Sequence, residues 1–201
     1  MKPAERRRVA STVRALLPEL HEKGRLLAAT PRGRILRGIY LEDSSDPASI
    51  YVWAFVQPLY VPSETLFFSL GKRLGGGSMT WDVSDPDAIA VVARDQGVPF
   101  FEPVTAPEAL VRWSYLDGRS DAAALQARAY SLIASGQFGQ GVESLRKLAS
   151  TLSVGPPWMM ELRQQAEGLA DLAAKDPDGA QALLAKWEAQ TASALRVHDL
   201  P

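Results

Sequence analysis

Residues 50–60 read IYVWAFVQPLY, and this stretch decides the fold that the sequence predicts. Almost every residue up to Val56 is β-branched or aromatic, which is the composition of a β-strand. Both faces of this strand would be apolar, so we place it in the interior of a sheet and not on a half-exposed surface. Pro58 cannot donate a hydrogen bond to a neighbouring strand, so we expect the strand to end or bulge there.

The segments around this central strand predict a meander preceded by a helix. Residues 4–20 carry Val9, Val13, Leu16 and Leu20 at helical spacing, which indicates an amphipathic helix. Short apolar segments separated by turn residues then favour a four- to five-stranded, mainly antiparallel sheet. We expect its strands, besides the central one, at residues 25–30, 34–41 and 65–70, with a fifth beginning near residue 79.

From Ser84 onward the pattern becomes helical. Helix-start signals recur, with a polar capping residue followed by proline and acidic groups, as in Ser84-Asp85-Pro86-Asp87. We expect this first helix to stop at Gly97, and Pro99–Val104 to form a rigid linker. The sequence therefore predicts an α+β fold with a sheet domain over residues 1–116, then an all-helical domain or extension over 117–201. The further helices are expected at residues 105–115, 120–135, 139–152, 158–174 and 177–195.

Residues 121–152 resemble one tetratricopeptide-type helical hairpin. The signature positions are occupied by small and apolar residues, although Gly141 stands where the family usually has Ala. The resemblance implies a scaffold for partner binding. A generic helical hairpin explains the same residues, and no second copy of the repeat follows. The matching residues are Ala129, Leu132, Gly136, Phe138, Leu145 and Leu148, with Pro156 just beyond.

Composition narrows the class of protein. The 201 residues are 46% hydrophobic and 22% charged, with a formal net charge of −1 and no cysteine. The missing cysteines exclude disulfides, thiol catalysis and thiolate-bound zinc. The N-terminus lacks the apolar core of a signal peptide, and no apolar run is long enough for a membrane span, so we expect a cytoplasmic protein. The abundance of Ala and Arg is typical of GC-rich bacterial genomes.

Motifs for catalysis and metal binding are missing from the sequence. His21 and His198 lie far apart and offer neither zinc-ligand spacing nor a base on a nucleophile elbow. Residues 71–78, GKRLGGGS, place Gly-Lys before the glycines, which is the reverse of a phosphate-binding P-loop. We therefore predict no catalytic residue, no metal ligand and no cofactor.

Basic residues on the predicted sheet suggest a ligand site. Lys72 and Arg73 would stand at a strand end beside a glycine-rich loop, and Arg37 would join them to hold an anionic small molecule. Arg32, Arg34 and Arg37 beside the sheet aromatics also outline a nucleic-acid surface. We do not expect nucleic-acid binding, because the net charge is not positive and no RNA-binding motif is present.

One apolar cluster in the helical half suggests a protein-binding surface. Trp158, Met159 and Met160 follow Pro156-Pro157, and exposed Met and Trp favour adaptable partner surfaces. If buried, they are simple core packing. The sequence-based hypothesis is a non-catalytic bacterial interaction or regulatory protein that binds a protein partner. The alternatives are an anionic small-molecule sensor and an enzyme without a recognisable motif, and the composition is also compatible with a homodimer.

Overall fold

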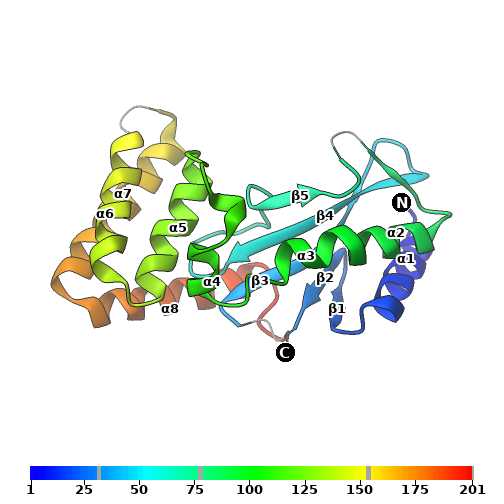
Figure 1. The fold of residues 1–201 in the computed structure, drawn as a ribbon, viewed down its shortest axis with the longest axis horizontal. Helices are drawn as coiled ribbons and strands as arrows, with labels where there is room; N and C mark the ends of the chain where they lie inside the picture. The colour runs from blue at the N-terminus through cyan, green and yellow to red at the C-terminus, as the bar shows by residue number, and fades with distance from the viewer. Residues whose placement is uncertain (31–32, 77–78, 153–154, 201) are drawn as a thin grey trace. The chain divides into compact units, whose positions relative to one another are not determined.

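The computed structural model describes residues 1–30, 33–76, 79–152 and 155–200 (Figure 1). The chain divides into two compact units, and neither is continuous in sequence. The first comprises Met1–Gln57, Leu70–Val104 and Asp199–Pro201, and the second comprises Pro58–Ser69 and Thr105–His198. This division differs from the predicted domains 1–116 and 117–201, because Pro58–Ser69 and residues 105–116 belong with the helices.

The first unit contains the predicted α+β arrangement with an antiparallel sheet. Strand β4, Ser49–Pro58, is the predicted central strand, and it ends at the proline. Within the described residues the sheet has six strands, in the order β1-β2-β3-β4-β5, and the two-residue β6 (Trp81–Asp82) pairs with β4. The remaining strands are β1 (Leu20–Lys23), β2 (Leu26–Ala29), β3 (Ile35–Asp43) and β5 (Gly71–Arg73).

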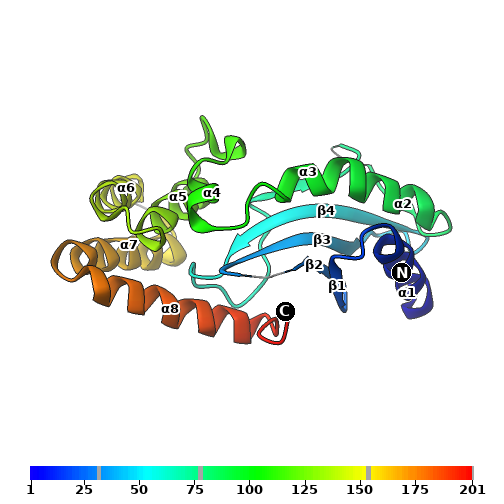
Figure 2. The same ribbon diagram turned by 60° about the horizontal axis from the view of Figure 1, so that its bottom comes forward.

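Helices cover one face of this sheet, and their apolar residues form the core of the unit. Helix α1 (Pro3–Leu16) packs on α2 (Pro86–Val92). Figure 2 shows α2 and the short α3 (Val98–Phe101) lying along the same face of β3 and β4. Alternate strand residues point into this layer, and most are fully buried: Ile35, Ile39, Leu41, Ile50, Val52, Ala54 and Val56.

The predicted helix stop at Gly97 is wrong. The chain continues from α2 through a π-helical turn, Ala93–Gly97, directly into α3, so the residues predicted as a rigid linker begin as helix. A Cβ atom at position 97 would lie 2.6 Å from Ile39 Cδ1 and 3.2 Å from Leu74 Cδ1. Gly97 is therefore explained by close packing on the sheet and not by helix termination.

The strand predicted at residues 65–70 is also wrong, because this segment is irregular. Pro58 and Pro62 remove backbone donors around the turn, and the Ser63 hydroxyl donates to the Thr65 carbonyl at 2.6 Å. Local side-chain bonding thus replaces a strand ladder here. The whole of Pro58–Ser69 belongs to the second unit.

The second unit is helical, as predicted. Helices α5 and α6 form a hairpin with Gly136 at φ +76° in its turn, which is the conformation that ends many helices at a glycine. Helix α6 also packs on α7, and α8 packs on α7 and α5. The helices are α4 (Pro107–Val111), α5 (Ala122–Ala134), α6 (Phe138–Thr151), α7 (Pro157–Lys175) and α8 (Pro177–Ala194), with a 3-10 turn at Ser114–Leu116.

None of the helices in the described ranges combines the length and the apolar character that crossing a lipid bilayer would require.

Candidate partner-binding groove

Two adjoining hollows lie on the surface of the second unit. The first has a volume of about 150 Å³, and the second has a volume of about 330 Å³. Four lining residues are common to both, so we treat the two hollows as one groove. The first hollow is lined by Pro58, Val61, Pro62, Phe67, Ser69, Ala123, Gln126 and Ala127, and the second by Pro62, Ser69, Ala122, Ala123, Gln126, Trp158, Glu161, Leu162 and Gln165.

Helix α5 supplies the floor of the groove. Ala123, Gln126 and Ala127 recur at spacings of three and four residues and therefore share one helix face. The small alanines leave room above the helix, and Gln126 contributes the amide that borders both hollows. Asp121 fixes the start of this helix by accepting a hydrogen bond from the Ala124 backbone N–H at 3.1 Å.

The Pro58–Ser69 segment forms a second wall, and hydrogen bonds tie it to the helices at several points. Tyr60 Oη and Ser131 Oγ lie 2.6 Å apart, and both side chains are buried. The Ser63 backbone N–H donates to Thr191 Oγ1 at 3.3 Å. At the far end of the segment, Arg119 Nη2 donates to the Ser69 carbonyl at 2.9 Å. These bonds hold the wall in place without a ligand, so the groove is preorganised.

Helix α7 supplies the third wall and divides the predicted apolar cluster. Trp158, on the same helix face as Glu161, Leu162 and Gln165, borders the groove with 56% of its surface exposed. Met160 is 45% exposed and lines another shallow hollow, which it shares with Glu161, Arg163, Gln164 and Glu167. Met159 is half-buried against Gly155. Of the three predicted partner-binding residues, only Trp158 borders the groove.

One carboxylate at the rim of the groove lacks a compensating cation. Glu161 is exposed and forms no ion pair with any residue in the described part of the chain. Its neighbour Arg163 is already engaged, because its Nε donates to Glu167 Oε1 at 2.8 Å one helical turn away. The open end of the groove therefore carries a net negative charge from Glu161.

A buried hydroxyl lies one turn beyond the groove floor on the same face of α5. Tyr130 has no exposed surface, and its ring stacks on Trp187 with centroids 5.9 Å apart. Its Oη has no hydrogen-bond partner among the residues that the structure describes. Burial raises the pKa of Tyr130 to about 12, and the nearby Gln126 amide opposes this shift without meeting hydrogen-bond geometry.

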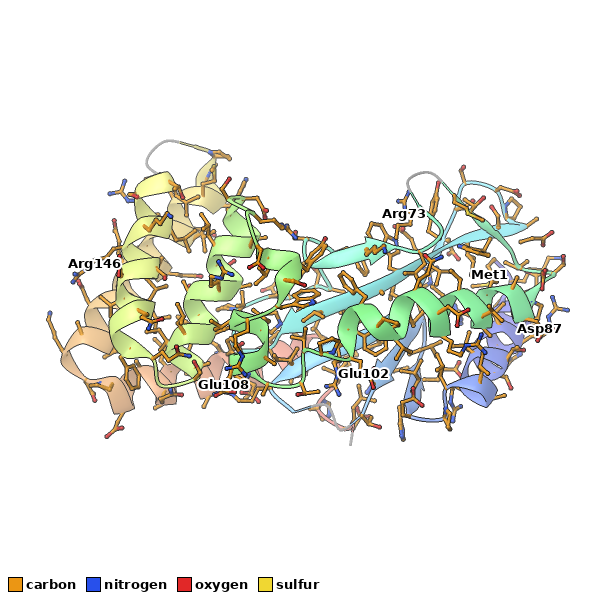
Figure 3. The ribbon with its side chains drawn as sticks, viewed as in Figure 1. Met1, Arg73, Asp87, Glu102, Glu108 and Arg146 are labelled. Atoms are coloured by element: carbon orange, nitrogen blue, oxygen red, sulfur yellow. The ribbon has the colours of Figure 1, made fainter. Side chains whose placement is uncertain are left out.

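The three residues predicted to hold an anion do not gather in one place. The Arg73 guanidinium lies 3.9 Å from the ring centre of Tyr51 and 4.9 Å from that of Trp53. Lys72 precedes it on β5, so its side chain points to the opposite face of the sheet. Figure 3 labels Arg73 on β5.

Arg37 lies on the helix-covered face and is only 7% exposed. Burial lowers the pKa of its guanidinium, and the charge of Glu102, labelled at the end of α3 in Figure 3, acts in the opposite direction. Arg37 is thus a buried charge of the core layer and is not open to a surface ligand. Of the basic and aromatic surface outlined in the sequence, Arg32 lies outside the described residues and Tyr60 is buried in the second unit.

Neither family models nor curated proteins nor solved structures provide a match to this chain. The candidate site therefore depends on its own geometry. The sequence-based hypothesis named Trp158 but did not name Phe67, Gln126 or the wall formed by Pro58–Ser69. The repeated small residues of α5 are the one sequence signal for the groove floor, and they are equally typical of helix packing.

Proposed function

We propose that this protein is a non-catalytic bacterial interaction protein of the cytoplasm, which binds a protein partner through the groove of its second unit. The bacterial and cytoplasmic parts of this proposal are supported by composition alone. The binding part is supported by the groove.

The observation that carries the proposal is the exposure of Trp158 at the edge of a preorganised groove. A tryptophan with 56% of its surface in water is a costly residue to leave uncovered, and tryptophans are enriched among the residues that dominate binding energy. The first hollow adjoins the one that Trp158 borders. Proline, valine, phenylalanine and alanine side chains wall it, and Ser69 and Gln126 are its polar residues. Such a surface fits an apolar anchor from another molecule.

The alternative of an anionic small-molecule sensor has less support. Arg37 is buried in the core layer, Lys72 is exposed on one face of the sheet, and Arg73 stacks on aromatic rings of the other face. An anion site needs convergent cations. The further alternative of an enzyme without a motif has no catalytic constellation to support it in the described residues.

The test is affinity capture with crosslinking from a lysate of the host organism. The wild-type chain is compared with Trp158→Ala and with Met160→Ala, an exposed apolar residue on another face of the same helix. We expect a stoichiometric partner, crosslinked next to the groove, that is lost with Trp158→Ala and kept with Met160→Ala. A partner that both variants retain would show that the groove is not the binding site.

A further inference from the structure

The shape and charge of the groove restrict the kind of partner segment that it can take. Resting on the proposed function, we infer that the groove binds an extended, polyproline II-type segment that inserts an apolar side chain into the first hollow and places a Lys or Arg beside Glu161.

The first hollow sets the size of the inserted side chain. Its volume of about 150 Å³ matches a cavity that accepts a ring the size of benzene, which is close to a proline ring or a leucine side chain. Apolar side chains form most of its walls, and Ser69 and Gln126 are its polar residues. An apolar group that enters here leaves water, which favours binding.

Together with the first hollow, the second hollow makes the binding site elongated. It shares Pro62, Ser69, Ala123 and Gln126 with the first, so the two hollows lie side by side. An amphipathic helix docks with a longer row of anchors at spacings of three, four and seven residues, for which two adjoining hollows are too few. A segment in extended or polyproline II conformation places successive side chains into neighbouring hollows.

Side chains that are able to donate hydrogen bonds line the groove. A polyproline II segment has no internal hydrogen bonds, so its carbonyl groups seek donors from the protein that binds it. Gln126 lines both hollows. Trp158 lines the second hollow, and its indole N–H donates to no residue in the described ranges. Grooves that bind proline-rich segments are commonly lined by aromatic residues.

Glu161 gives the segment its charge requirement. The carboxylate borders the second hollow without a cation of its own, whereas the neighbouring Arg163 and Glu167 neutralise one another. A basic residue in the segment would supply the missing charge. Because the site is exposed, this pair changes affinity only modestly and acts mainly on selectivity.

The probe is a fluorescein-labelled peptide PPLPPKPP, compared with PPLPPEPP and followed by fluorescence anisotropy on the full chain. We expect saturable binding of the lysine peptide below about 1 mM and weaker binding of the glutamate peptide. Glu161→Gln is expected to reduce the preference for lysine over glutamate by about threefold. Ala123→Leu, which fills the first hollow, is expected to weaken binding by about tenfold or more.

Met160→Ala serves as the control and is expected to bind like the wild type, and circular dichroism melts confirm that every variant is folded. The inference is overturned if PPLPPKPP does not saturate, if Ala123→Leu binds like the wild type, or if Glu161→Gln leaves the charge preference unchanged. If the protein forms a dimer that Ala123→Leu abolishes, a second copy of the chain occupies the groove, and the inference is overturned as well. If the peptide fails to bind but the affinity capture still yields a partner that is lost with Trp158→Ala, only this inference is overturned. If the captured partner does not depend on Trp158, the proposed function is overturned as well.

Discussion

Tyr60 and Ser131 are joined by a buried hydrogen bond of 2.6 Å whose direction can be assigned. The single proton of Ser131 Oγ is directed at the Ala127 carbonyl, also at 2.6 Å. The hydroxyl of Tyr60 must therefore donate to Ser131 Oγ. These two hydrogen bonds connect the wall formed by Pro58–Ser69 to helix α5, which forms the floor of the groove.

The assigned direction predicts unequal effects of removing either partner. Tyr60→Phe leaves Ser131 with its own proton bonded, so we expect a loss of about 1 kcal/mol in unfolding free energy. Ser131→Ala removes both the bond from the Tyr60 hydroxyl and the bond to the Ala127 carbonyl, so we expect a larger loss, of about 1–3 kcal/mol. Urea unfolding checks both values. In the double variant the loss should fall short of the sum, and strict additivity would mean that the two hydroxyls do not interact.

The Pro58–Ser69 segment shows why local sequence patterns predict the strands of the sheet better than they predict the groove. The central strand is evident from residues 50–57, because its apolar character on both faces is a local property. Strand β5, Gly71–Arg73, has no pattern of its own and exists through pairing with β4, where Trp53 faces Arg73. Residues 65–70 are apolar for a different reason. Residues 65–69 belong to the helical unit, and the groove that this segment helps to form is assembled from three segments distant in sequence.

The close approach of α6 to α5 depends on Gly141. A Cβ atom at this position would lie 2.4 Å from Ile133 Cδ1 and 3.1 Å from the Ile133 backbone nitrogen. Alanine normally stabilises a helix interior relative to glycine, but here the clash outweighs that gain, so we expect Gly141→Ala to cost about 1–3 kcal/mol. The measurement is the unfolding free energy in urea.

Gly168, in the middle of α7, provides the matched control. A Cβ atom there meets nothing within 4 Å, so Gly168→Ala should stabilise the protein by about 0.5–1 kcal/mol. A neutral or stabilising Gly141→Ala would contradict the packing argument. The departure from the tetratricopeptide pattern at this position thus has a physical reason, which depends on the neighbouring helix and could not be predicted from the sequence.

Arg73 is expected to stabilise the sheet edge and not to bind an anion. Its guanidinium lies over the rings of Tyr51 and Trp53, so Arg73→Ala should lower the unfolding free energy by about 0.5–2 kcal/mol. Lys72→Ala changes the adjacent exposed residue and should stay within about 0.5 kcal/mol of the wild type. Thermal melts of the wild type and both variants measure these two changes in stability. Equal effects of the two substitutions would argue against the stacking role.

The pKa of Tyr130, raised to about 12, makes stability depend on pH in the alkaline range. In the unfolded chain the phenol ionises near its ordinary pKa of about 10, so above this pH the unfolded state binds fewer protons than the folded state. The stabilising contribution is complete below pH 10 and is lost as the pH rises through 12, with a slope of up to about 1.4 kcal/mol per pH unit.

Tyr130→Phe should remove this part of the pH dependence of the unfolding free energy. At neutral pH it should also be close to neutral or slightly stabilising, because it deletes a buried hydroxyl without a partner. Urea unfolding of the two proteins between pH 8 and 12 measures the difference, and identical slopes would show that Tyr130 is not shielded from ionisation.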